Sequence, residues 1–490
     1  MTGHRAPPGK NVLLLFPPMQ EYLYGDRWRL TESPTAPLGL LYLAPPLIRA
    51  GYKVKFVDLS VDKLQKDEYF RVLGNSDFIL ISCYSQALSN VHRIIGDIRS
   101  IHEDAWVICG GPHCNETEDH VDGADVTVYG EAESVIADIL DRISSEKSWT
   151  DIPGISYSSH GSLVRNPGFH TIQDLDSLEP PSFDLAKNKK YGYLYGIKVN
   201  NIAGIMTSRG CPYECTFCTF RRVRYRERSV GRVIEEIKKR REEGADYLVF
   251  FDDNFLINKN RAREIMGEII KNRIPLKMAV QSRVDFVDQD LLKKLKEAGV
   301  IIMMFGVESA NQDVLDFYKK KATVASAERA ISLAHQSGLI TFGTLIIGAP
   351  METDSHFEAN ARFFKEIPLD LVSIHILDYV CGSTLWEEAC RKGLIDKSEI
   401  LVAADRRVSN YTTEELARIR NELIKSFYHN RRRLLRLTHK LVAALGVMSI
   451  FNLIKMFLCG AIYRPSARFH GAEAKNIKLS RPRTSSKFNL

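Results

Sequence analysis

The 490-residue sequence lacks histidine between His170 and His335, and no cysteine follows Cys218 until Cys381. This gap matters because three cysteines stand close together just before it, within residues 211–218. A structural zinc site closes its tetrahedron with four Cys or His ligands at short spacings. No local fourth ligand exists here, so the sequence excludes a closed zinc site built from this segment.

The first ten residues are polar and lack the apolar core of a secretory signal. The chain has only nine cysteines, six of them outside residues 211–218. We therefore expect a cytoplasmic protein without disulfides. Hydrophobic residues make up 44% of the chain and charged residues 26%, which is ordinary for a globular protein of two or three domains.

Cys211, Cys215 and Cys218 form a C-x3-C-x2-C motif. Three thiolates are one fewer than a fully ligated cubane cluster requires, so one metal position stays open. The motif follows an apolar run, residues 202–206, and precedes a helical stretch. It resembles the signature of the radical S-adenosylmethionine (SAM) enzymes. The resemblance implies a 4Fe-4S cluster on these cysteines, SAM chelated by the open iron, and a 5'-deoxyadenosyl radical formed by reductive cleavage.

The first 150 residues alternate short apolar runs with helix-length segments. This pattern predicts an α/β fold with a doubly wound parallel sheet, whose ligands bind at the carboxyl ends of the strands. The expected strands cover residues 11–16, 53–57, 77–82, 105–109 and 125–129. Turn residues suited to close approach of a ligand follow the last three of them. They are Ser82, Ser85, Gly110, Gly111, Gly130 and Glu131.

Four segments of this region, residues 37–44, 51–58, 110–113 and 125–131, look like the cobalamin-binding domain that precedes the barrel in one large branch of the radical SAM family. The D-x-H-x-x-G motif that supplies a lower axial histidine in the wider cobalamin family is absent. The resemblance therefore implies bound cobalamin whose cobalt has no histidine ligand from the protein. We interpret His113 as a turn residue.

Six further strand-like runs follow residue 201, each separated by an amphipathic helix. This repeat predicts a partial (β/α)6 barrel, with its active site at the C-terminal rim of the strands. The segment before it is rich in Ser, Gly, Pro and Asp and is expected to be a linker with short strands. We place the cobalamin-binding domain at residues 1–150, the linker at 151–200, the radical SAM barrel at 201–400, and a helical, basic tail at 401–490.

Side chains near the ends of the expected barrel strands are candidates for binding SAM or substrate. Phe217 takes the position of the aromatic residue that lies beside the adenine in the resembled family. Arg283 suits a bidentate pair with the SAM carboxylate, and Glu308 suits hydrogen bonds to a ribose or amino group. The alternative for Arg283 and for Asp253 is a surface salt bridge. The remaining candidates are Asp252 and Asp253, as carboxylates for an ammonium group, Gln281, Ser309 and Gly348.

The net charge of +7 is concentrated in the tail. Residues 431–490 contain 13 Lys or Arg and a single acid, Glu473, so the rest of the chain is net negative. The basic run is not interleaved with aromatic residues, so we expect no nucleic-acid partner.

An apolar stretch, residues 441–463, follows the basic run and as a helix would be about 35 Å long, enough to span a membrane. Ser449, Asn452 and Lys455 recur every third residue, which instead favours a helix lying in the membrane plane. We predict peripheral membrane contact through residues 431–463. The alternative is a helix packed under the barrel.

The joined motifs, over roughly residues 11–380, resemble the branch that contains the anaerobic magnesium-protoporphyrin ester cyclase, the bacteriochlorophyllide methylases and the hopanoid methylases. The resemblance implies a methyltransferase acting on unactivated carbon, in which one SAM methylates reduced cobalamin and a second yields the radical that abstracts a substrate hydrogen. It also implies a low-potential electron donor such as ferredoxin or flavodoxin.

The tail favours a large apolar substrate, and we place a bacteriochlorophyllide side chain first. The first alternative is a cyclase or ring-forming enzyme on a tetrapyrrole or polyprenoid lipid. The second is a non-catalytic cobalamin carrier.

Overall fold

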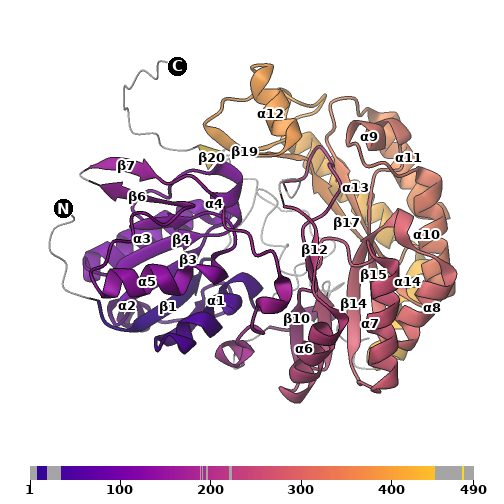
Figure 1. Ribbon diagram of the computed structural model, residues 1–490. Coiled ribbons are helices and arrows are strands. Elements are labelled where there is room, and N and C mark those ends of the chain that lie inside the picture. Colours follow the sequence, from indigo (N-terminus) through magenta and orange to yellow (C-terminus); the bar gives the residue numbers. More distant parts are fainter. Residues whose placement is uncertain are drawn as a thin grey trace.

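Two α/β units lie side by side in the computed structural model (Figure 1). The structure describes residues 8–18, 35–159, 161–187, 189, 191–194, 197–219, 223–446 and 477–478. The first unit is built on a seven-stranded sheet, and the second is built on a six-stranded sheet.

The first unit is a parallel sheet covered by helices on both faces. Its parallel strands are β1 (Asn11–Phe16), β2 (Lys53–Asp58), β3 (Phe78–Ser82), β4 (Trp106–Gly110) and β5 (Val126–Val128). Its helices are α1 (Leu38–Arg49), α2 (Lys66–Gly74), α3 (Leu88–Ile101), α4 (Pro112–Thr117) and α5 (Ile136–Ser144). Apolar side chains of α1 and α5 pack on one face and those of α2 and α3 on the other. Burial on both faces explains why β1, β3 and β4 are nearly continuous apolar runs. The predicted doubly wound sheet is confirmed.

Two more strands extend this sheet beyond β5. They are β6 (Ile155–Ser159) and β7 (Ser162–Arg165), and both pair antiparallel, giving the order β2-β1-β3-β4-β5-β6-β7. The start of the predicted linker is therefore part of the first sheet. The chain then continues through η4 (Leu175–Ser177), η5 (Phe183–Ala186), β8 (Tyr193–Leu194) and β9 (Ile197–Lys198).

The second unit is an open barrel of six parallel strands, as the sequence predicts. In order around the sheet they are β10 (Ile202–Ile205), β13 (Tyr247–Phe250), β14 (Lys277–Arg283), β15 (Val300–Glu308), β16 (Ile340–Ile347) and β17 (Leu371–Ile376). The helices of this unit are α6 (Val230–Glu242), α7 (Lys259–Lys271), α8 (Gln289–Glu297), α9 (Gln312–Phe317), α10 (Val324–Gln336), α11 (Asp354–Glu366) and α13 (Thr413–Tyr428). One large apolar cluster joins helices and strands.

A small sheet lies beside the barrel rim, next to the first unit (Figure 1). Its strands are β18 (Asp378–Val380), β19 (Glu399–Ala403) and β20 (Ile477–Lys478), and α12 (Thr384–Arg391) connects the first two. β19 contacts η2 (Ser85–Ala87) of the first unit, so this sheet helps to join the two units.

The basic tail begins as a helix that packs on the barrel. In α14 (Arg431–Leu445), Leu437 and Leu441 are buried among apolar residues near the N-terminal ends of the barrel strands, including Ile340. Arg433 is buried as well and donates hydrogen bonds to carbonyl oxygens of the barrel. The alternative of a helix packed under the barrel thus describes residues 431–445, while Arg431, Arg432 and Leu435 stay exposed and the predicted membrane contact stays a prediction.

The predicted membrane-plane helix falls mainly on residues 447–463, outside the described residues. Within the part of the chain that the structure describes, no helix is both long enough and apolar enough to cross a membrane.

Candidate functional site

The three motif cysteines lie in a loop, residues 211–219, that follows β11 (Ser208–Arg209) at the C-terminal end of β10. We call this segment the cysteine loop. Cys215 is buried, Cys211 and Cys218 are partly exposed, and none of the three is in a disulfide. No three His, Cys, Asp or Glu side chains among the described residues are grouped so as to hold a single metal ion. Three thiolates in one loop can ligate three irons of a cubane cluster and leave the fourth iron open, so this donor set fits a cluster better than structural zinc, which takes four ligands.

Asp252 accepts hydrogen bonds from two residues that lie just before the cysteine loop, Thr207 and Ser208. Its carboxylate is fully buried and accepts hydrogen bonds from the Thr207 backbone N–H at 3.1 Å and from Thr207 Oγ1 at 2.6 Å. Ser208 Oγ donates a third bond at 2.5 Å. Burial raises the pKa of Asp252, and these bonds oppose the rise. The geometry favours a bracing role for Asp252 over the predicted contact with an ammonium group.

Asp253 is the better-placed carboxylate of the pair. Burial and the neighbouring Asp252 raise its pKa to about 6, and its charge acts on the thiol of Cys211. None of the described basic side chains forms a salt bridge with it, so the surface-pair alternative finds no support there. Gln281, within β14, donates through Nε2 to the carbonyl oxygen of Asp252 at 2.7 Å.

Arg283 lies beside the cysteine loop with its guanidinium already paired. Its Nε and Nη2 donate to the two carboxylate oxygens of Asp285, both at 3.0 Å. Its Nη1 lies 3.9 Å from Cys215 Sγ, and the guanidinium stacks 3.8 Å from the Tyr213 ring centroid. A bidentate pair of Arg283 with a SAM carboxylate would therefore compete with Asp285.

Lys320 is a site candidate that the sequence did not single out. It is buried, and its Nζ donates to Glu308 Oε1 at 2.6 Å. Glu308 has a left-handed backbone, φ 64°, at a bulge in the pairing of β15 with β16. A Cβ at Gly306 would stand 2.5 Å from Glu308 Oε1 and 2.9 Å from Lys320 Nζ, so the glycine makes room for the pair. Burial raises the pKa of the Cys215 thiol, and the charge of Lys320 opposes this.

The aromatic residue of the cysteine loop packs on the following part of the rim. Phe217 meets Tyr318 edge to face, with ring centroids 5.2 Å apart. Nearby in the barrel, the backbone N–H of Gly348 donates to Glu352 Oε2 at 2.5 Å, and burial raises the pKa of Glu352 to about 7. Glu352 was not singled out either, although its place four residues after the strand-ending glycine offered a signal.

Ser309, directly after Glu308, is buried, and its hydroxyl accepts a hydrogen bond from the Asn311 backbone N–H at 3.1 Å. The structure thus uses this hydroxyl in a local turn. Its predicted contact with a ribose or amino group stays a prediction.

The predicted cobalamin-side turns gather at the carboxyl edge of the first sheet. Ser82 ends β3 and Gly110 ends β4, and these residues lie in register. Gly111 has φ 108°, and a Cβ there would stand 3.1 Å from the carbonyl oxygen of Cys83, so the two turns are packed backbone to backbone. Packing within the protein thus explains the glycine at position 111, and the predicted close approach of cobalamin to these turns stays a prediction.

Ser85 and His113 form a buried pair behind these turns. Ser85 Oγ lies 3.0 Å from His113 Nδ1, and burial lowers the pKa of His113, which keeps the imidazole neutral. The histidine occupies the second position of α4 rather than the turn itself.

Gly130 and Glu131 take part in contacts within the protein. A Cβ at Gly130 would stand 2.6 Å from the backbone nitrogen of His170, so packing alone requires glycine there. Glu131 accepts bonds from Arg226 Nη1 at 2.8 Å and Nη2 at 2.7 Å, and Arg209 Nη1 lies 3.3 Å away. Glu131 therefore joins the first unit to the barrel, and its predicted contact with cobalamin stays a prediction.

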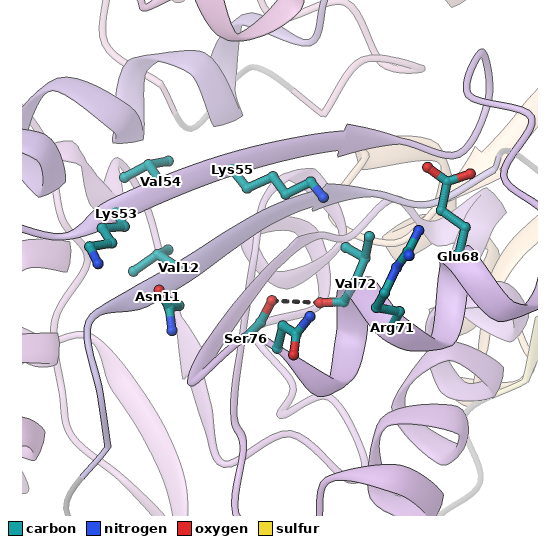
Figure 2. Close-up of a pocket in the computed structure, with 10 residues that line it drawn as sticks. Asn11, Val12, Lys53, Val54, Lys55, Glu68, Arg71, Val72 and Ser76 are labelled. Atoms are coloured by element: carbon teal, nitrogen blue, oxygen red, sulfur yellow. Dashed lines mark hydrogen bonds between the residues drawn. The ribbon is translucent and has the colours of Figure 1, made fainter.

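The cavity in Figure 2, about 310 Å³, lies at the opposite edge of the first sheet. It is lined by residues at the starts of β1 and β2, such as Asn11 and Lys53, and by residues of α2, such as Arg71. It is therefore separate from the turns and the cysteine loop.

Comparisons with known proteins agree with this geometry. The Radical SAM superfamily matches residues 205–364, and the B12 binding domain matches residues 30–140. An uncharacterized methyltransferase of Pyrococcus horikoshii is 29% identical over 435 residues, which is 85% of this chain and 92% of the relative. The anaerobic magnesium-protoporphyrin IX monomethyl ester cyclase of Rubrivivax gelatinosus is 26% identical over 418 residues, 81% of this chain and 73% of the relative.

Among solved structures, the radical SAM methyltransferase TsrM of Kitasatospora setae, with cobalamin and a [4Fe-4S] cluster bound, superposes with a TM-score of 0.63 at 19% identity. The match covers 78% of this chain and 75% of that one, and it shows a shared fold.

The chain therefore combines a B12 binding domain with a radical SAM domain, and the predicted resemblance and fold are confirmed. It is an enzyme, and its cofactors are a 4Fe-4S cluster, SAM and cobalamin.

Proposed function

We propose that the protein is a cobalamin-dependent radical SAM methyltransferase that methylates an unactivated carbon of a large apolar substrate, with a bacteriochlorophyllide side chain as first candidate. The observation that carries the proposal is the meeting of the cysteine loop with the first unit. Thr219 of that loop donates a hydrogen bond to Glu116 of α4 at 3.1 Å. This contact supports a site in which SAM would be cleaved next to the turns predicted to hold cobalamin.

The bound groups supply the hard chemistry: the cluster and SAM give a radical able to attack a C–H bond, and cobalamin carries the methyl group. The protein's own residues hold and orient them. Cys211, Cys215 and Cys218 would ligate the cluster. Lys320 and Glu308, a cation and an anion side by side, suit the carboxylate and the ammonium group of SAM.

An apolar substrate is supported by the rim itself. Phe251, directly after β13, exposes 36% of its surface. Ligand sites are typically lined by apolar and aromatic side chains with few polar groups. One relative is named for a magnesium-protoporphyrin ester, which adds support for a tetrapyrrole.

The same relative favours a second candidate function, ring formation on a tetrapyrrole, because it is a cyclase with 26% identity over most of this chain. In that reaction cobalamin would deliver no methyl group. A non-catalytic cobalamin carrier is the third candidate, and a carrier would form no 5'-deoxyadenosine.

The test is to disrupt the gene in its host and to compare anaerobic pigment and lipid extracts by mass. A methyltransferase should leave a precursor lighter by about 14 Da for each missing methyl group, because each methyl replaces one hydrogen. A difference of one oxygen, or of two hydrogens without carbon, would support the cyclase. Purified enzyme given SAM with a deuterated methyl group should transfer the label to that precursor.

A further inference from the structure

Three segments that are distant in sequence meet at one side chain, Glu116. It lies on α4, immediately after the Gly110-Gly111 turn of the first unit. Glu116 Oε1 accepts a hydrogen bond from Thr219 Oγ1 at 3.1 Å, and Thr219 directly follows Cys218. Glu116 Oε2 accepts a longer bond from Ser85 Oγ at 3.3 Å. One carboxylate thus bonds both the β3 turn and the cysteine loop.

The backbone of Glu116 receives a third segment. Cys381 Sγ, just after β18, points to the Glu116 carbonyl oxygen at 3.7 Å. Gly382 packs on the same atom, because a Cβ there would stand 3.1 Å from it. The residue is therefore fixed from the barrel side through both its side chain and its main chain.

We propose that Glu116 is a positioning residue that sets the distance between the cobalamin-side turns and the cysteine loop. This proposal rests on the proposed function, because the distance between the turns and the loop matters only if a methyl group passes from SAM to cobalamin. In that transfer the S–CH3 bond of SAM breaks, the electron pair of reduced cobalamin takes the methyl group, and S-adenosylhomocysteine leaves. The low-potential donor that the proposed function requires supplies the reduced cobalamin.

The two fates of SAM depend on Glu116 differently. Reductive cleavage to 5'-deoxyadenosine needs only the cluster and SAM, which residues of the barrel unit would hold. Formation of S-adenosylhomocysteine also needs the first unit at the correct distance. A shift of about 1 Å in such a geometry can cost 10²-fold in rate. Loss of Glu116 should therefore slow the formation of S-adenosylhomocysteine much more than the formation of 5'-deoxyadenosine.

The test uses the full-length, cofactor-loaded protein with SAM, a chemical reductant and no substrate. In Glu116→Ala we expect S-adenosylhomocysteine formation to fall on the order of 10- to 100-fold. Formation of 5'-deoxyadenosine should stay within about twofold, because the barrel residues are unchanged. Thr219→Val, which removes the hydroxyl donor, should show the same separation. Glu116→Gln keeps an oxygen acceptor and an amide that the hydroxyls can bond, so it should restore most of the lost activity.

Glu118→Gln is the matched control. Glu118 follows α4 and pairs with Arg165 of β7 at 2.6 Å, within the first unit, so both products should form as in the wild type. A parallel loss of both products in Glu116→Ala and Thr219→Val, or no loss of either, would overturn the proposal.

A second measurement does not depend on activity. In the cofactor-free protein, Glu116→Ala should speed hydrogen–deuterium exchange in both α4 and the cysteine loop, while Glu118→Gln should not change the loop. If the wild type formed no S-adenosylhomocysteine, the proposed function would fail, and exchange would still decide whether Glu116 couples the two segments. Unchanged exchange in the cysteine loop would refute the coupling.

Discussion

Lys320 Nζ donates a 2.6 Å hydrogen bond to Glu308 Oε1, and this buried ion pair stands beside the cysteine that lies deepest in the motif, Cys215. The pair is held by a bulge in β15 and by the space that Gly306 leaves. It makes two charges available at the point where SAM would approach the open iron.

Replacing Lys320 tests this pair. Removing one partner leaves an uncompensated buried charge, which typically costs 3–5 kcal/mol. We expect Lys320→Met to lower the free energy of unfolding of the cofactor-free protein by about 3 kcal/mol and to weaken SAM binding. Lys319→Met and Lys321→Met, on exposed neighbours, should change neither. The double variant Lys320→Met/Glu308→Gln should regain stability but not SAM binding; failure to regain stability would show that the two residues are not coupled.

Replacing Cys215 tests the cluster. With two thiolates left, Cys215→Ala should lose the cluster iron, the charge-transfer absorption and all 5'-deoxyadenosine formation. The matched control is Cys390→Ala, because Cys390 is a free, partly exposed thiol near the C-terminal end of α12 and is not part of the motif. A Cys215→Ala protein with full iron content and SAM cleavage would contradict the cluster assignment.

The cobalt environment can be tested by electron paramagnetic resonance. His113 is buried, with Nδ1 bonded to Ser85 at 3.0 Å, so we expect cob(II)alamin on the protein to show no nitrogen superhyperfine splitting. His113→Gln should leave that spectrum unchanged. A nitrogen triplet in the wild type that disappears in the variant would make His113 a ligand after all.

Asp378 predicts a pH dependence of stability. Its Oδ1 is buried without a hydrogen-bond partner, and burial raises its pKa from 3.8 to about 7. Between about pH 4 and pH 7 the folded protein keeps a proton on Asp378 that the unfolded chain releases. The contribution of this protonation to the free energy of unfolding is therefore fully present below pH 4 and is lost as the pH rises through 7. The melting temperature should therefore fall more between about pH 5 and pH 8.5 in the wild type than in Asp378→Asn. The exposed Asp290→Asn should behave like the wild type, and parallel curves for all three proteins would contradict the raised pKa.

Much of the fold could be predicted because strands that are buried on both faces consist mainly of apolar residues, which the sequence shows as short apolar runs. The five parallel strands of the first sheet and the six strands of the barrel could be predicted from the alternation of these apolar runs with helix-length segments. The addition of β6 and β7 to the edge of the sheet at β5 could not be predicted from the sequence. Segments rich in Ser, Gly and Pro have little periodicity in hydrophobicity, and the pairing depends on tertiary contacts.

The cysteines were identifiable because their spacing is local, but the side chains around them come from separate strands. Lys320 is the middle of three consecutive lysines, and only the structure separates the buried one from its exposed neighbours. Glu131 stood at a plausible turn, yet its partners Arg209 and Arg226 lie far along the chain. The sequence therefore shows the cysteine motif, but it does not show which carboxylates form ion pairs within the protein.

The docking of α14 limits the routes into the enzyme. Leu437 and Leu441 fill the N-terminal end of the barrel, and Arg433 ties the helix to barrel carbonyl groups. SAM and substrate would therefore enter, and nucleoside and product would leave, at the opposite end of the strands, where the cysteine loop lies.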